Sequence, residues 1–241
     1  MTLESPTQSE IDAFFYFAQR DPLAKKLQAE QIVDKTLRIP FWRYVERTLG
    51  HTLDRWQLHL CNRLEKLRWQ KGHRIMFHAP PQIGKSSVVS QRLVPWLIGH
   101  APAMRAKVAC FNIERATRHT RVAKQIMGFS AHKAIFPEMD SMVNPNAPDK
   151  EWSTLARQQK YDSQPSYHAL GLESGFTGDG ADFLLIDDPY SSADQARSRI
   201  QTNKICSFWP DTAQPRLSDD TNVILMFHRY TEDDLAGRML E

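Results

Sequence analysis

The stretch RIMFHAPPQIGKSSVVSQRLV, residues 74–94, joins a short apolar run to a glycine-containing turn and then to an amphipathic run. This order predicts a buried strand, a tight loop and a helix. The tripeptide Gly84-Lys85-Ser86 stands where the loop would meet the helix. A phosphate-binding loop needs inward-facing backbone N–H groups, a lysine for the terminal phosphates and a hydroxyl for Mg²⁺. The stretch therefore predicts a nucleotide site.

The residues of this loop can be given separate roles. We expect Gly84 to let the backbone approach a phosphate, Lys85 to bind the terminal phosphates and Ser86 to bind Mg²⁺. Ala79 stands where the usual pattern has its first glycine, and the following Pro80-Pro81 pair stiffens the turn. The alternative is a chance Gly-Lys-Ser turn, which the flanking strand and helix disfavour. The predicted nucleotide-contacting segment is Pro81, Gln82, Ile83, Gly84, Lys85, Ser86 and Ser87.

A second motif, which is acidic, follows about a hundred residues after the loop, in ADFLLIDDPY, residues 181–190. The four apolar residues 183–186 predict a buried strand. Ligands of open α/β sheets bind at the carboxyl ends of such strands. We expect Asp187 to lie on the Mg²⁺ side and Asp188 to orient the attacking water. The alternative is an ordinary strand-ending turn, since Asp and Pro are favoured there.

The rest of the chain predicts an α/β fold. Further short apolar runs lie at 107–113, 166–170 and 223–227, and helical patterns lie at 86–99, 114–129, 151–160 and 192–208. This alternation predicts a P-loop NTPase with a mostly parallel central sheet and helices on both faces. Helical patterns at 8–20, 23–36, 41–49 and 53–69 precede it. The predicted division is a helical arm or layer over 1–50 and an ATPase domain over 51–241.

Composition narrows the class of protein. Of the 241 residues, 41% are hydrophobic and 24% are charged, as in ordinary globular domains. No apolar run approaches the roughly 18 residues that span a bilayer, and the N-terminus lacks the basic start of a signal peptide. Cys61, Cys110 and Cys206 are far apart, which favours inert thiols over a zinc site. We expect a cytosolic protein with no membrane partner. The net charge of +3 permits a nucleic-acid partner without requiring one.

Five blocks in order resemble one family, the ATPase domain of the large terminase subunit of tailed bacteriophages. APPQIGKS is similar to that family's deviant phosphate loop. The other blocks are ACFNIERATRHTRVAKQIM (109–127), SGFTGDGADFLLIDDPYSSADQARS (174–198), FWPDTAQPRL (208–217) and NVILMFHRYTEDDLAGRML (222–240). The similarity runs from about Leu53 to the end of the chain.

The resemblance implies a function and partners. It implies a motor that hydrolyses ATP with Mg²⁺ and moves double-stranded DNA into a prohead, gripping phosphates rather than reading bases. It also implies a homo-oligomeric ring, a portal or prohead partner, a small terminase subunit and a location in the host cytoplasm but not in the mature virion. At matching positions, Trp56 and Gln57 would contact adenine. His228 would sense the γ-phosphate and couple hydrolysis to movement.

The chain departs from the family pattern at several positions. Gln82 replaces a basic residue in the loop, and Asp179 replaces an arginine that can act on a neighbouring subunit. Arg197, Arg216 and Arg229 are unranked alternatives for that arginine, each also readable as an ordinary ion-pairing residue. No carboxylate cluster of the family's nuclease domain is recognised, so nuclease activity is not expected of this chain. Two alternatives stay open: a nucleotide-binding assembly module with little hydrolysis, and another phosphate-loop DNA translocase or helicase.

Overall fold

The computed structural model of the chain describes residues 39–139, 142–159, 164–173 and 180–240. The helices predicted over 8–20 and 23–36 lie outside the described residues, as does Asp179.

Helices and strands alternate along the described chain. The strands are β1 (Arg74–His78), β2 (Ala106–Cys110), β3 (Glu151–Trp152), β4 (Tyr167–Gly171), β5 (Phe183–Asp187) and β6 (Asn222–Phe227). The α-helices are α3 (Phe41–Leu49), α4 (Arg55–Leu64), α5 (Lys85–Val88), α6 (Val94–His100), α7 (Ile113–Met127), α8 (Ser130–Ile135), α9 (Leu155–Gln158), α10 (Ala193–Arg197), α11 (Arg199–Ser207) and α12 (Leu235–Leu240). The 3₁₀- and π-helical turns are η1 (Glu65–Arg68), η2 (Val89–Leu93), η3 (Pro137–Met139), η4 (Phe208–Ala213) and η5 (Gln214–Arg216).

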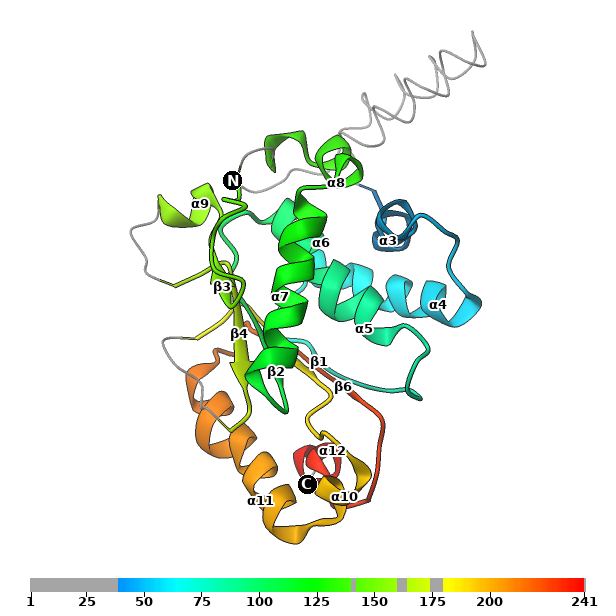
Figure 1. Cartoon of the computed structure of the whole chain (residues 1–241), viewed down its shortest axis with the longest axis vertical. Helices are drawn as coiled ribbons and strands as arrows, with labels where there is room; N and C mark the ends of the chain where they lie inside the picture. The colour runs from blue at the N-terminus through cyan, green and yellow to red at the C-terminus, as the bar shows by residue number, and fades with distance from the viewer. Residues whose placement is uncertain (1–38, 140–141, 160–163, 174–179, 241) are drawn as a thin grey trace, which may run out of the picture.

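The strands form one sheet in the order β1-β6-β5-β2-β4-β3. Figure 1 shows where most of the strands and helices lie in the molecule. All neighbouring pairs are parallel except β3 and β4. The strand before the predicted phosphate loop is thus separated from the acidic strand β5 by β6 alone. Because the strands are parallel, the ends of β1, β6, β5 and β2 meet at one edge of the sheet, here called the carboxyl edge.

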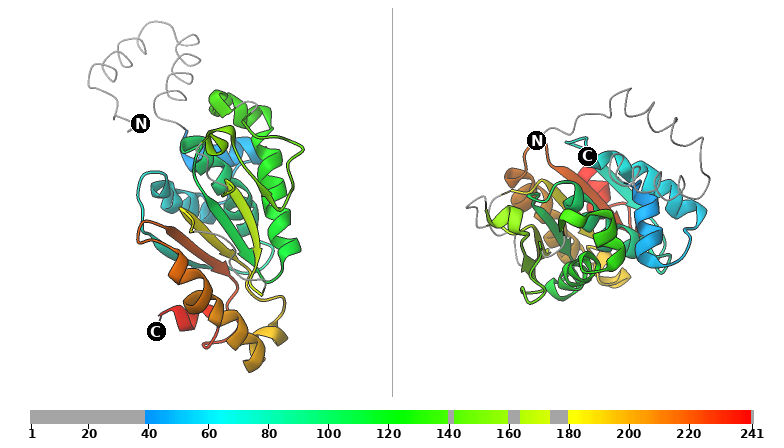
Figure 2. Two further views of the ribbon diagram at one scale, coloured as in Figure 1. Left: turned by 90° about the vertical axis from the view of Figure 1, so that its left-hand side faces the viewer. Right: turned by 90° about the horizontal axis from the view of Figure 1, so that it is seen from above.

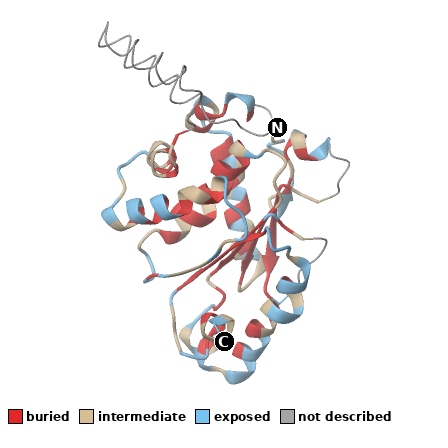
Figure 3. Ribbon diagram, turned by 180° about the vertical axis from the view of Figure 1, so that it is seen from behind, coloured by how far each residue is buried: buried red, intermediate tan, exposed pale blue. Residues whose placement is uncertain are grey.

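Helices cover both faces of the sheet, as the sequence predicts (Figure 2). Side chains of the inner strands alternate between the two faces, so Val108 and Leu185 join one core whereas Ala109 and Leu184 join the other. Residues of α3, α4, α6 and α7 complete the first core, and residues of α10, α11 and α12 complete the second. Figure 3 shows the strands as a buried layer between more exposed helices. Near-continuous apolar strands are typical of a parallel sheet covered on both sides.

Helix α3 packs into the first core. Phe41 lies against Trp96, with ring centroids 5.1 Å apart, and the Tyr44 hydroxyl hydrogen-bonds His132 Nδ1 at 2.9 Å. Burial lowers the pKa of His132 to about 4, so this buried imidazole is neutral at pH 7. The described part of the predicted helical arm, from residue 39, is therefore a layer of the main domain.

The helix predicted over 151–160 is wrong in its first part. Glu151 and Trp152 form the antiparallel edge strand β3, and only Leu155–Gln158 is helical. Trp152 is buried and its indole N–H donates to the Thr120 carbonyl at 3.0 Å. Thr154 caps α9 by accepting a hydrogen bond from the Arg157 N–H. A buried tryptophan and a capping threonine set this boundary, and the apolar pattern alone did not reveal them.

The helical run after the phosphate loop has no break at Pro95. It passes from α5 through the π-helical turn η2 into α6, where Pro95 lies in the first turn.

All three cysteines are free and buried, as predicted. Burial raises the pKa of Cys61 to about 12, which keeps this thiol protonated and unreactive.

Candidate active site

The loop after β1 turns through two residues with left-handed backbones. Gly84 has φ +86° and Gln82 has φ +64°, both in the left-handed region. The positive φ favours glycine at position 84, and an added Cβ would lie 3.1 Å from the Gln57 side-chain nitrogen, a tight contact. The Ala79 N–H donates to the Phe227 carbonyl at 3.3 Å, which ties the start of the loop to the end of β6.

The loop leaves its backbone donors unused. Within the described residues, the backbone N–H groups from Gln82 to Ser87 donate no hydrogen bond. The helical run that follows extends from Lys85 to His100 through α5, η2 and α6. Unused N–H groups at the start of a helix are the donors that a phosphate binds.

Lys85 points toward the acidic strand end. Its side chain is only 7% exposed, and its Nζ lies 3.4 Å from Oδ1 of Asp188. Because an unpaired buried ammonium is costly, this carboxylate compensates the charge of the lysine. The two residues predicted to act together are therefore brought together.

Asp187, the last residue of β5, is fully buried. Its Oδ2 accepts a hydrogen bond from the Ser90 hydroxyl at 2.5 Å and lies 3.1 Å from His119 Nε2. The imidazole contact is close, although its angles fall short of a directed hydrogen bond. Burial by itself raises the pKa of Asp187, but His119, with the hydroxyls of Ser90 and Ser86, holds the pKa below its ordinary value. Asp187 is therefore an ionised carboxylate at neutral pH.

Asp188 follows with an unusual backbone. Its φ is +47°, a left-handed conformation that aspartate tolerates better than most residues. Its N–H donates to the Met226 carbonyl at 3.0 Å, and its own carbonyl accepts from the Phe111 N–H at 3.3 Å. Both neighbouring strands thus fix this turn, so that the side chain points to Lys85. Arg115 Nη2 lies 2.6 Å from the second carboxylate oxygen, Oδ2.

The residues around Asp187 fit a magnesium ion. Oδ1 of Asp187 is buried and has no hydrogen-bond partner among the described residues. The Ser86 hydroxyl, which interacts with the same carboxylate, opens the helix beside it. One carboxylate oxygen and one hydroxyl are a set that Mg²⁺ accepts when phosphates and water complete its octahedral shell. No group of three or more His, Cys, Asp or Glu side chains that could hold a metal occurs in the described ranges.

The predicted adenine residues lie on two sides of α4. Gln57 is buried, its Oε1 accepts from the Asp54 N–H at 2.9 Å, and its amide nitrogen lies toward Gly84. Trp56 instead stacks on Phe77 with ring centroids 6.4 Å apart. It lines a groove of about 930 Å³ between α4 and β1, the free edge strand of the described sheet. The structure therefore brings Gln57 to the loop, whereas Trp56 faces the groove.

His228 and the three arginines make other contacts than the acidic pair. His228 is exposed and meets the Tyr230 ring edge-on, with centroids 5.2 Å apart. Arg229 Nε donates to buried Asp234 at 2.8 Å, and Arg216 donates to the Thr212 carbonyl at 2.6 Å. Arg197 is exposed at the end of α10. Among the described residues, no hydrogen bond or ion pair links any of the four to Lys85, Asp187 or Asp188.

Three residues at the site escaped the sequence reasoning: Ser90, Arg115 and His119. Ser90 lies one helical turn after Ser86, and His119 lies one turn after Arg115 on the first part of α7. These i, i+4 spacings place each pair on one helix face. The i, i+4 spacing of these residues was therefore visible in the sequence. Only the strand order shows that α7 begins beside the end of β5.

Comparisons with known proteins give a distant structural likeness. No protein-family model matches the chain, and no curated protein sequence matches it either. Among solved structures, the crystal structure of the HK97 bacteriophage large terminase is similar at 13% sequence identity with a TM-score of 0.49. The match covers 82% of this chain and 39% of that chain.

The fold and the loop define the class of the chain. It has a strand, a glycine-lysine-serine loop and a helix, with an acidic strand end two places along a mostly parallel sheet. This is the α/β fold of a P-loop NTPase.

No helix in the described part of the chain is both long and apolar enough to cross a bilayer.

Proposed function

We propose that the chain binds Mg-ATP at the loop 81–87 and hydrolyses it, as the motor domain of a phage DNA-packaging terminase. The observation that carries the catalytic part is the meeting of Lys85 and Asp188, 3.4 Å apart, beside a loop with unused N–H groups. A carboxylate held against the phosphate-binding lysine is where the γ-phosphate and its attacking water would meet.

Binding uses groups that are already in place. The backbone N–H groups of the loop and the Lys85 ammonium receive the β- and γ-phosphates. Gln57, packed beside Gly84, lies within reach of the nucleotide as well. When bound beside Ser86 and Asp187, Mg²⁺ supplies positive charge that offsets the charge of the phosphates.

Hydrolysis transfers the γ-phosphoryl group to water. The water oxygen forms a bond to the γ-phosphorus, the bond to the bridging oxygen breaks, and ADP leaves. Asp188 orients the water and accepts its proton, which later departs with inorganic phosphate. Lys85 stabilises the negative charge on the transferred oxygens.

The motor part rests on the five sequence blocks that resemble, in order, segments of the terminase family. Coupling would pass along β6, whose end is bonded to Ala79 and leads to His228. DNA would be held through its phosphates, so binding should weaken steeply as salt rises. Ring assembly, and an arginine from a neighbouring subunit, belong to the same proposal.

A measurement of phosphate release tests this function. The full chain is assayed with Mg-ATP, with and without duplex DNA, beside Lys85→Ala and the control Lys71→Ala, whose lysine is exposed in a surface pair with Asp220. We expect activity that requires Lys85, is unaffected at Lys71 and rises with DNA. Nucleotide binding without turnover in every protein would instead favour the assembly module. Turnover without DNA stimulation would contradict the motor part alone.

A further inference from the structure

Arg115 occupies a position that its local structure does not favour. It is the third residue of α7, where Asn112 caps the helix by accepting the Arg115 N–H. A cation in the first turn opposes the helix dipole, which favours negative charge there. The guanidinium also brings a second positive charge to Asp188, which already has Lys85. Helix stability therefore does not explain this arginine.

The Arg115 guanidinium is bonded to Asp188 but keeps a hydrogen-bond donor without a partner among the described residues. Arg115 Nη2 lies 2.6 Å from Asp188, and the guanidinium carbon lies 5.9 Å from the centre of the Phe111 ring. Its Nε is buried and has no hydrogen-bond partner among the described residues. The side chain is 36% exposed, so one side of the group stays open at the carboxyl edge. An arginine with spare donors can exchange one anionic partner for another.

Asp188 is poorly suited to catalysis while it is paired with both cations. One oxygen faces Lys85 and the other faces Arg115, so both lie against cations. A carboxylate that accepts a proton from water needs a free oxygen toward that water. Since neighbouring strands fix its backbone, its availability depends on whether these cations have another anion to bind.

We propose that Arg115 is a nucleotide-responsive positioning residue, which holds Asp188 through this ion pair and moves to the γ-phosphate when ATP binds. The inference rests on the proposed nucleotide function and adds a control to it. Phosphate draws Lys85 and Arg115 away together, and one oxygen of Asp188 becomes free for water. ADP lacks the γ-phosphate, so Arg115 returns to Asp188 after hydrolysis. Arg115 would then supply the positive charge that the loop lacks at Gln82.

The test compares a triphosphate with a diphosphate in the full chain. Affinities for Mg-ADP and for a non-hydrolysable ATP analogue with Mg²⁺ are measured for wild type, Arg115→Ala, Arg115→Lys and the control Arg118→Ala. Arg118 is an exposed arginine on the same helix. We expect Arg115→Ala to weaken binding of the analogue about tenfold, the size of one charge-assisted contact, with ADP affinity unchanged. Arg115→Lys should recover part of the loss, and Arg118→Ala should change neither affinity.

A double-mutant cycle separates the exchange from simple attraction. Asp188→Asn frees Arg115, so it should tighten binding of the analogue, and this gain should shrink when Arg115 is alanine. An equal gain in both backgrounds, or equal loss of both nucleotides in Arg115→Ala, would overturn the proposal while leaving the nucleotide function intact. If wild type binds neither nucleotide, the proposed function itself fails and this inference falls with it.

Discussion

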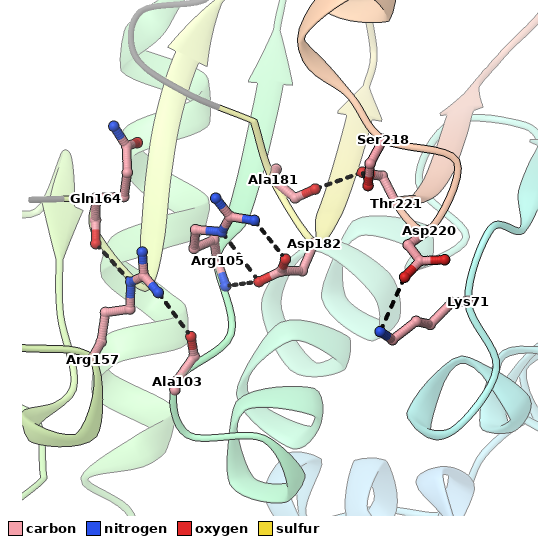
Figure 4. Close-up of polar contacts among 10 residues, drawn as sticks. All are labelled: Lys71, Ala103, Arg105, Arg157, Gln164, Ala181, Asp182, Ser218, Asp220 and Thr221. Atoms are coloured by element: carbon pink, nitrogen blue, oxygen red, sulfur yellow. Dashed lines mark hydrogen bonds and ion pairs between the residues drawn. The ribbon is translucent and has the colours of Figure 1, made fainter. Parts of the chain in front are cut away.

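The two ends of β5 carry acidic residues in opposite circumstances. At the amino end, Asp182 takes hydrogen bonds from the Arg105 backbone and guanidinium, with Nη2 to Oδ1 at 2.8 Å (Figure 4). Its side chain is 45% exposed. At the carboxyl end, Asp187 is buried with one oxygen unpartnered among the described residues, and Asp188 lies between two cations.

The difference separates structural charge from functional charge. The Arg105–Asp182 ion pair at the amino end is hydrogen-bonded and partly exposed to solvent. Such exposed pairs contribute about 0–1 kcal/mol to stability. At the carboxyl edge, burial makes the same charges costly, so they persist only where a partner or ligand compensates them. Asp187, a buried and incompletely paired carboxylate, and its neighbour Asp188 are therefore the part of the sheet to test for chemistry.

The largest expected effect comes from removing the charge of Asp187. Asp187→Asn keeps the shape of the side chain but removes the ligand charge beside Ser86. We expect phosphate release to fall at least about a hundredfold, since one preorganised electrostatic contact contributes that much to catalysis. Asp220→Asn, in an exposed pair with Lys71, is the control and should retain full activity. Equal activity of the two variants would remove Asp187 from the site.

The next effect is a contrast between two glycines. Gly84 and Gly50 have φ of +86° and +82°, but only at Gly84 would a Cβ meet another side chain within 4 Å. Both Gly→Ala variants should lose about 1 kcal/mol of unfolding free energy from backbone strain. Only Gly84→Ala should also lose nucleotide affinity, by about tenfold or more, because the loop cannot keep its shape. Denaturant unfolding and nucleotide titration of both variants measure the contrast. Intact affinity in Gly84→Ala would contradict the assigned loop.

A smaller effect distinguishes the two ends of β5 by pH. The pKa values of Asp187 and Asp182 both lie below the ordinary aspartate value in the folded chain. Each folded carboxylate therefore binds fewer protons than the unfolded one near pH 4, and its stabilisation is complete above that pH and is lost as pH falls. We expect Asp187→Asn to remove more of the acid sensitivity of unfolding than Asp182→Asn, because solvent screens Asp182. Unfolding midpoints between pH 3 and 6 report this difference, and equal slopes would contradict it.

The smallest effect is expected at the amino end itself. Arg105→Ala removes the bidentate contact to Asp182, and stability should fall by no more than about 1 kcal/mol. Nucleotide affinity and turnover should be unchanged, since Arg105 precedes β2 at the amino end of the parallel strands, whereas Lys85 follows the carboxyl end of β1. Thermal unfolding with an ATPase assay checks both statements. A loss of turnover in the folded variant would mean that the two edges are coupled.

Local patterns predicted much of this fold. The strands before the loop and before Asp187-Asp188 lie within a residue or two of their predicted bounds, because apolar runs bounded by turns have few alternatives. The antiparallel β3 was missed, since two residues carry no period and its burial depends on Trp152 meeting α7. Tertiary contact decided that element, and sequence periodicity could not.

The candidate site was likewise predicted only in part from the sequence. Lys85, Ser86, Asp187 and Asp188 follow from motif spacing, because phosphate chemistry dictates residue types at fixed positions. Arg115 and His119 could not be ranked, since α7 carries several other basic residues of the same kind. Strand order alone places its first turns against the acidic pair. The adenine assignment of Trp56 and the coupling role of His228 remain predictions.

The most direct test makes one substitution at each end of β5. Asp188→Asn and Asp182→Asn are compared with wild type for Mg²⁺-dependent release of phosphate from ATP by the folded full chain. The account predicts that Asp188→Asn binds ATP but loses turnover at least about a hundredfold, whereas Asp182→Asn turns over like wild type. Equal turnover by Asp188→Asn and wild type would contradict the assignment of the carboxyl edge as an ATP-hydrolysing site.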